Sequence, residues 1–313
     1  MHKHSLHGLL LVDKPEGITS NDVVRTVKRL VKPSKVGHSG TLDPAASGLI
    51  VILIGAGTRT LEYLDETPKW YSLTVRLGEQ TDTDDRDGTI IRTADPSTIT
   101  LGEIEEVLQN YRGVIDQVPP HFSAIKKSGV PLYKLAHKGT LVTPEPRKVE
   151  VFLLEVRRWE QPFLDLDLIC SKGTYARSLA RDIGRDLAVG GRLERLRRTA
   201  AGVFKIENAS PLEEISAGGS AAIAEKLISL ARALSHIPDL PITPPELRTL
   251  TRGGAVIIPK SRLPRPEVST VQQTQLFKIV SGNGGLVILV RPQPKRSEIL
   301  IRPTRVFNTL KNG

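Results

Sequence analysis

Hydrophobic positions in the first sixth of the chain follow two different periods, and each period predicts a different kind of element. Residues 8–12 form a short apolar run that ends at a polar turn, which indicates a strand. After a cap cluster at residues 19–22, valines and leucines recur at helical spacing as far as Val31, so a helix is predicted there. A loop over residues 32–48 then leads into residues 49–54, an uninterrupted, largely β-branched run that predicts a central strand buried on both faces.

Further strands and helices follow in irregular order. The pattern predicts strands at residues 70–77, 149–159 and 164–170, and helices at residues 101–111, 174–187 and 221–234. An acidic turn at residues 81–89 interrupts them, and so does a long surface insertion at about residues 117–146, rich in Pro, Gly, Lys and His. Because strands and helices do not alternate regularly, we expect an α+β class with a mixed sheet rather than a doubly wound sheet.

The C-terminal quarter has a different character. Residues 235–245 contain four prolines and read as a linker. Short strand-like runs broken by Gly and Pro follow it and predict a small β-barrel, at residues 255–258, 276–280, 286–290 and 299–301. For a chain of 313 residues we therefore expect two domains, residues 1–238 and 239–313.

Charge narrows the class of partner. The net charge is +10, and the excess falls in two stretches: residues 172–205 carry nine Lys/Arg against three Asp/Glu, and residues 260–305 carry nine against two. Such stretches attract an extended polyanion and favour nucleic acid, although on charge alone a merely solubilising surface is equally consistent. No apolar run approaches the ~18 residues of a membrane span, the start lacks the order of a signal peptide, and the single Cys170 fits a reducing compartment. We expect a cytoplasmic protein.

The segment richest in candidate chemistry is a glycine-punctuated loop at residues 37–48, which holds His38 and Asp43 and feeds directly into the predicted buried strand. Glycines allow close approach of the backbone to a ligand, and Pro44 restricts the chain after Asp43. As an isolated Asp-Pro pair, a turn residue would be favoured by roughly three to one.

The whole string resembles the G-H-x-G-x-L-D-P-x-A-x-G signature of the tRNA pseudouridine-55 synthases, the TruB family. Other family motifs have counterparts in the same order, and the resemblance spans roughly residues 8–205. The matching segments are Leu9-Leu10-Leu11-Val12-Asp13-Lys14-Pro15, Tyr71 with Leu77-Gly78-Glu79-Gln80-Thr81-Asp82-Thr83-Asp84, the insertion with Pro119-Pro120, Phe122-Ser123-Ala124, Lys126 and Tyr133, Lys172-Gly173-Thr174-Tyr175-Ala176-Arg177, and Leu196-Arg197-Arg198.

The resemblance implies three catalytic residues. Asp43 would be the nucleophile, and a carboxylate there suits attack on either C1′ or C6 of the target uridine. Arg177 would pair with Asp43 and keep it anionic. Tyr71 would stack on the flipped uracil and help to remove the C5 proton. Without the motifs, Arg177 would read as a helix-surface arginine and Tyr71 as a cross-strand aromatic.

Four further residues would serve substrate binding by the same resemblance. Tyr175 would hydrogen-bond the uracil, and Leu196, otherwise an ordinary core leucine, would pack against it. His38 would enter the space that the flipped base leaves, since no nearby ligands support a metal role for it. Lys14 would support the catalytic loop.

The family resemblance also implies a pseudouridine-synthase catalytic domain with an RNA-gripping insertion, followed by a PUA-like RNA-binding domain. The expected partner is the T arm of tRNA, bound by a monomer that requires no protein partner, no cofactor and no metal. The basic helix at residues 174–187 and the C-terminal domain would hold phosphates.

Three alternatives stand beside this interpretation. The same scaffold could bind or chaperone RNA without catalysis, or it could belong to the related archaeal and eukaryotic class that works in a guide-RNA particle. A nucleotide-dependent oxidoreductase is disfavoured, because the glycine-containing run at residues 55–60 lacks the third glycine of a dinucleotide fingerprint.

Overall fold

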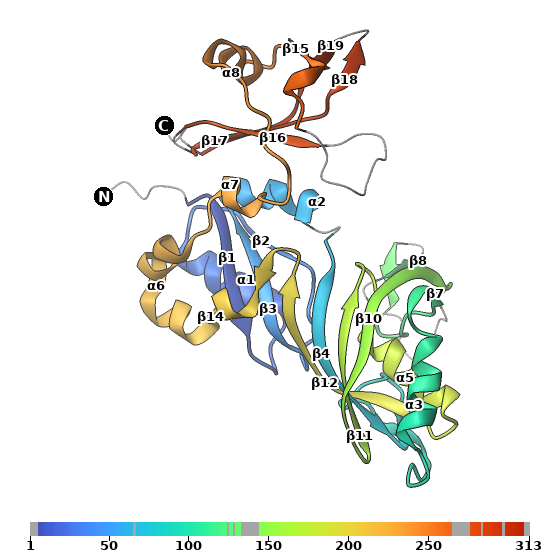
Figure 1. Ribbon diagram of the computed structural model, residues 1–313. Coiled ribbons are helices and arrows are strands. Elements are labelled where there is room, and N and C mark those ends of the chain that lie inside the picture. Colours follow the sequence, from blue (N-terminus) through green and yellow to red (C-terminus); the bar gives the residue numbers. More distant parts are fainter. Residues whose placement is uncertain are drawn as a thin grey trace.

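A computed structural model describes residues 6–64, 67–123, 125–127, 129–132, 144–264, 276–282, 284–295 and 298–309. Its centre is a ten-stranded sheet in the order β14-β1-β3-β12-β4-β11-β10-β7, with β2 paired to β3 and β13 paired to β12 (Figure 1). The strands are β1 (Gly8–Lys14), β2 (Val36–Ser39), β3 (Ser47–Ile54), β4 (Lys69–Leu77), β7 (Gly113–Gln117), β10 (Arg147–Glu160), β11 (Phe163–Cys170), β12 (Gly191–Ala201), β13 (Phe204–Lys205) and β14 (Ser210–Pro211). The β1–β14 and β3–β12 pairings are parallel and the other pairings of this sheet are antiparallel, so the predicted mixed sheet of an α+β fold is confirmed.

Strands β1 and β3 are buried on both faces, as the apolar run at residues 49–54 predicted. On one face they pack against α1 (Ser20–Leu30) and α6 (Leu212–Lys226) through the alternate residues Leu10, Val12, Ile50, Ile52 and Ile54. Thr19 caps α1 in a reciprocal capping box with Asp22, which fixes where that helix begins. The strand and helix expected at the start of the chain are therefore confirmed.

The other half of the sheet is covered by α3 (Leu101–Gln109) and α5 (Ala176–Asp186), which lie on the same side of β4, β10 and β11 (Figure 1). Thr100 caps α3 through a second capping box, with Glu103. A hairpin of β5 (Glu79–Thr81) and β6 (Ile90–Thr93) encloses the acidic turn. These elements match the predicted strands, helices and turn at residues 70–111 and 149–187.

Three expectations in the N-terminal part are wrong. The loop at residues 32–48 contains β2, and the arginine-rich residues 191–201, read only as a motif, form the central strand β12. The helix expected at residues 221–234 is instead the end of α6 and the short α7 (Leu230–Ala233), because the chain between them is extended and pairs through Ile228 with Leu9.

The C-terminal part begins with a helix that the sequence pattern did not predict, α8 (Pro244–Thr251). Its strands form two separate three-stranded sheets, so the described residues do not close into the expected barrel. These sheets consist of β15 (Val256–Pro259), β19 (Glu298–Ile301) and β18 (Gln293–Lys295), and of β16 (Phe277–Val280), β17 (Leu286–Val290) and β20 (Pro303–Asn308).

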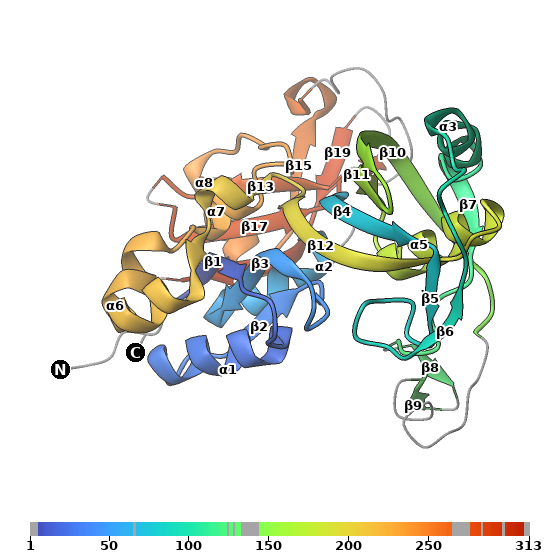
Figure 2. The same cartoon turned by 90° about the horizontal axis from the view of Figure 1, so that it is seen from below.

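The second of these sheets shares a core with the N-terminal part. Val287, Leu289 and Phe307 belong to the same buried cluster as Leu9 and Leu11 of β1. A separate core around Ile258, Ile288 and Ile301 lies within the C-terminal part. In the view from below, this part stands behind the β1–β3 half of the large sheet (Figure 2).

The predicted insertion is described only in pieces. They include β8 (Lys126–Lys127) and β9 (Val130–Pro131), which pair antiparallel, whereas Tyr133 lies outside the described residues. Across the described ranges, no helix combines the length and the apolar character that spanning a bilayer would require.

Candidate active site

The loop that carries Asp43 runs from β2 to β3 and is fastened on both sides of this residue. Before it, the buried Ser20 hydroxyl accepts a hydrogen bond from the Leu42 amide (2.8 Å) and donates one to the Leu42 carbonyl (3.0 Å). After it, the Pro44 carbonyl accepts from Lys14 Nζ (3.4 Å) and from the Gly17 amide (2.9 Å). The β1–α1 connection therefore positions the loop.

Lys14 is fully buried at the end of β1. Its ammonium also donates to the carbonyls of Pro15 and Ile18, both at 2.8 Å, so its hydrogen bonds join the two loops. Burial lowers the pKa of Lys14, and the negative charge of Asp43 opposes that shift. The expectation that Lys14 contacts the loop agrees with this geometry.

Arg198 of β12 supports the same loop from beneath and is 1% exposed. Its Nε donates to the Leu49 carbonyl (2.7 Å) and its Nη2 to the Gly40 carbonyl (3.2 Å). At Gly48 the backbone has a φ of +103° and a Cβ atom would lie 2.3 Å from the Arg198 carbonyl oxygen, so only glycine fits. A sequence reading could have singled out Arg198 as a charged residue followed by the small apolar residues Ala200 and Ala201.

Arg177 joins the loop to the rest of the site. Its Nη2 lies 3.0 Å from Oδ2 of Asp43 and its Nη1 lies 3.5 Å from Oδ2 of Asp85. The guanidinium also donates to the carbonyls of Thr83 (3.3 Å) and Phe122 (3.0 Å). The side chain of Arg177 is 8% exposed and that of Asp43 is 41% exposed, so the carboxylate is held by a buried cation but stays accessible from solvent. Burial raises the pKa of Asp85, and the charge of Arg177 opposes the rise.

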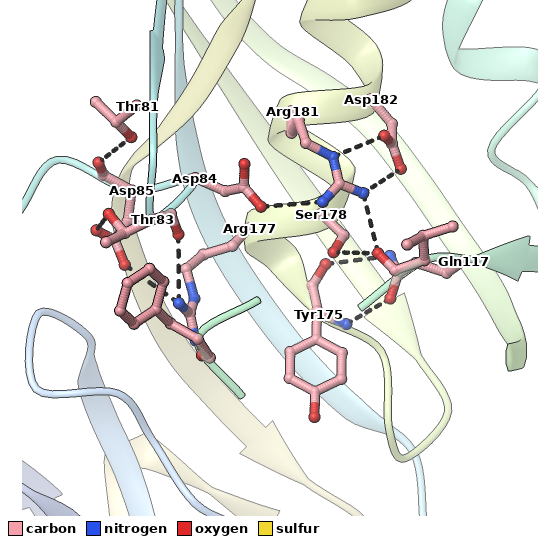
Figure 3. A network of polar contacts seen from close by, with 12 residues as sticks. Thr81, Thr83, Asp84, Asp85, Gln117, Tyr175, Arg177, Ser178, Arg181 and Asp182 are labelled. Atoms are coloured by element: carbon pink, nitrogen blue, oxygen red, sulfur yellow. Dashed lines mark hydrogen bonds and ion pairs between the residues drawn. The ribbon is translucent and has the colours of Figure 1, made fainter. Parts of the chain in front are cut away.

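The start of α5 also anchors the root of the insertion (Figure 3). Gln117 accepts a hydrogen bond from the Tyr175 amide (2.8 Å) and donates one to the Tyr175 carbonyl (3.1 Å). The Val118 carbonyl accepts from Ser178 Oγ (2.8 Å) and from Arg181 Nη2 (2.9 Å). Sequence reasoning missed Gln117, because an isolated glutamine at the start of a polar insertion gives no pattern.

The charges of α5 differ from the expectation that this helix presents cations to phosphate. Arg181 pairs with Asp84 at 3.0 Å and with Asp182 at 3.0 Å, and its side chain is only 17% exposed. Arg177 is occupied as described above. Two of the three arginines of α5 therefore neutralise internal carboxylates (Figure 3).

The aromatic candidates lie around Asp43 and Arg198. Burial raises the pKa of Tyr71, partly offset by Arg198, which stands opposite it in the β4–β12 pairing. Burial likewise raises the pKa of Tyr175, and Asp43 adds to the rise in both tyrosines. Burial and the Arg198 charge lower the pKa of His38 in β2, so its imidazole is neutral at pH 7.

A pocket brings several of these residues together. Asp43, Arg177 and Leu196 line it, along with Asp85 and Arg195. Tyr71, Tyr175 and Lys14 are close enough to feel the charge of Asp43, whereas His38 is coupled to the group through Arg198. Among the described residues, no three His, Cys, Asp or Glu side chains gather as they would around a metal ion. An accessible carboxylate paired with a buried guanidinium can act as a nucleophile towards a ligand in this pocket.

Comparisons with known protein families agree with this geometry. Residues 28–176 match the model for the TruB family pseudouridylate synthase N-terminal domain, and residues 177–234 match that for the tRNA pseudouridylate synthase B C-terminal domain. The chain belongs to the TruB family. It is therefore a pseudouridine synthase, an enzyme that isomerises uridine.

Curated relatives cover most of the chain. A tRNA pseudouridine synthase B from Syntrophotalea carbinolica is 38% identical over 93% of this chain and 94% of its own length. One from Geobacter sulfurreducens is 40% identical over 79% of this chain and 82% of its own length.

Among solved structures, a chain of a Cbf5-Nop10-Gar1 complex superposes with a TM-score of 0.73 at 25% identity, over 98% of this TruB-family chain and 86% of that chain. A chain of an H/ACA RNP bound to a substrate RNA has a TM-score of 0.72 at 23% identity, over 97% and 86%, and shows the fold alone. The pseudouridine-synthase fold is thus shared with proteins that were crystallised together with partners.

Proposed function

We propose that this enzyme converts uridine-55 in the T loop of tRNA to pseudouridine, with Asp43 as the nucleophile. The observation that carries the proposal is the ion pair between Asp43 and the buried Arg177 in a pocket of a TruB-family chain. A neighbouring guanidinium favours the carboxylate over the carboxylic acid, and it restricts the direction in which the carboxylate points.

The reaction is an isomerisation. The N1–C1′ bond breaks, the uracil turns within the pocket, C5 joins C1′, and the proton lost from C5 is balanced by one gained at N1. Because a base within a folded loop cannot reach the pocket, the uridine is extruded first. We propose that His38 enters the vacated space as a neutral ring, while Leu196 packs against the base and Tyr175 hydrogen-bonds it.

Tyr71 completes the proposed pocket by stacking on the uracil. The raised pKa of Tyr71 keeps its hydroxyl a neutral phenol in the resting enzyme. Its help in removing the C5 proton would draw on Arg198, the cation that opposes that rise. Lys14 positions the Asp43 loop and takes no part in the bond changes.

We further propose that residues 1–238 are the catalytic domain and that residues 239–313 form a PUA-like RNA-binding domain. The separate core around Ile258 and Ile301 supports that division. The enzyme would act as a monomer on tRNA without protein partners, which distinguishes it from a guide-RNA particle.

A T-arm RNA labelled with tritium at uracil C5 tests this function. The wild-type protein alone should release tritium, and RNA with cytidine at position 55 should release none from that site. Asp43→Asn should abolish release while retaining RNA binding, whereas Asp95→Asn, an exposed aspartate that caps a turn at Ser97, should behave as wild type. Turnover that survives in Asp43→Asn would exclude the nucleophile, and no release by the wild-type protein would favour an RNA-binding role.

A further inference from the structure

The wall of the Asp43 pocket formed by β12 has an irregular geometry. The pairing of β12 with β4 shifts between Leu193 and Arg195, which face Val75 and Thr74, so Glu194 is an extra residue. In a regular strand only alternate residues reach one face, yet the four consecutive residues 193–196 line the pocket. A bulge of this kind redirects side chains at a site, and here it brings Arg195 to the pocket beside Leu196.

The other arginines around this wall are already occupied. Arg177 holds Asp43 and Asp85, and Arg86 pairs with Glu16 at 2.6 Å. The neighbouring Arg192 lies 2.6 Å from Glu194, which removes the nearest carboxylate as a partner for Arg195.

Arg195 differs from all of these. It is exposed, and within the described part of the chain it makes neither an ion pair nor a side-chain hydrogen bond. The pocket nevertheless needs a further cation for an RNA ligand, because the single guanidinium of Arg177 faces the two carboxylates of Asp43 and Asp85. A cluster of that composition has a negative balance and repels phosphate.

We propose that Arg195 binds a backbone phosphate of the nucleotide that enters the Asp43 pocket. The inference rests on the proposed function. The sugar whose C1′ reacts with the base carries a phosphate on each side, so a pocket that admits this nucleotide brings phosphates to its rim. A free arginine at the rim offers a forked donor that suits phosphate oxygens and that fixes the sugar relative to Asp43.

The test compares Arg195→Gln, Arg195→Lys and the matched control Arg232→Gln in the full-length protein. Arg232 lies on α7, is exposed, and has no described ion pair either, so its replacement removes the same charge elsewhere. With T-arm RNA, Arg195→Gln should raise KM about fivefold to tenfold with kcat nearly unchanged, and should reduce the slope of log affinity against log salt by about 1. Arg195→Lys should restore most of that slope.

Binding in the Asp43→Asn background separates this inference from the proposed function. If the wild type releases no tritium, the function fails, but the salt slopes of the Asp43→Asn proteins still show whether Arg195 contacts RNA. An unchanged slope and KM for Arg195→Gln, or an equal loss for Arg232→Gln, would overturn the phosphate contact even with full wild-type turnover.

Discussion

Gln117 and Tyr175 hold each other by two hydrogen bonds, in which the glutamine amide pairs with both backbone groups of the tyrosine. The pairing joins the end of β7, where the insertion starts, to the first residue of the segment that carries Tyr175 and Arg177. The position of the insertion and the position of two candidate site residues are thus linked through one buried side chain.

Gln117→Ala should lower both stability and turnover. It leaves two backbone groups of Tyr175 without a partner, which costs about 1–3 kcal/mol for each buried group, and it frees Tyr175 to shift. Urea unfolding and tritium release measure the two effects. Gln109→Ala, at an exposed position of α3, should change neither, and equal effects of the two variants would contradict the role of Gln117.

Ser20→Ala should reduce kcat with little change in KM. The variant removes both hydrogen bonds to Leu42, so the residue before Asp43 loses its anchor while the pocket walls are unchanged. Stability should fall by about 1–3 kcal/mol. Single-turnover kinetics provide the measurement. The control Ser97→Ala, whose hydroxyl bonds only the nearby Asp95, should keep wild-type kcat, and a Ser20→Ala enzyme with the same kcat would show that the loop needs no such anchor.

Gly48→Ala and Gly113→Ala form a matched pair. Both glycines have positive φ, +103° and +80°, so each alanine incurs backbone strain of about 1–2 kcal/mol. At Gly113 nothing lies within 4 Å of the added Cβ, whereas at Gly48 it would meet the Arg198 backbone at 2.3 Å. Gly48→Ala should therefore be the more destabilising in thermal unfolding, and should also lose activity. Equal melting temperatures would contradict the close approach of β3 and β12.

Stability should depend on the charge of His38. Its pKa is below 6.5 in the folded protein because of burial and Arg198, so the unfolded chain binds the proton more readily. As pH falls from above 6.5 through the folded pKa, this group should destabilise the fold progressively, and the penalty should be absent at pH 7.5. Urea unfolding of wild type and His38→Gln between pH 5 and 7.5 measures the difference. A difference between the two proteins that does not vary with pH would contradict it.

Much of the fold follows from local patterns, and what does not follow involves distant contacts. The apolar residues 49–54 and the capping residues Thr19 and Thr100 gave β3, α1 and α3 correctly, because burial and capping act within a few residues. Strand β12 was missed because its arginines are satisfied by carbonyls and carboxylates far away in the sequence, such as Leu49 and Asp13.

The same reasoning applies to the site and to the C-terminal part. The family motif led to Asp43 and Arg177, and the ion pair between them agrees with it. Asp85 and Gln117 were missed because their importance depends on what they face, which spacing does not reveal. The expected barrel was wrong because short strands show where hydrogen bonds form, but not with which neighbour, and here they pair within two small sheets.

The cluster that joins Leu9 to Phe307 has a consequence for how the protein matures. Leu9 leaves the ribosome first and Phe307 leaves last among the members of this cluster. Until then one face of β1 lacks part of its apolar cover, although its partner β3 is made early. The nascent chain therefore exposes a sticky strand during much of its synthesis, and this strand is a natural point for a chaperone to hold.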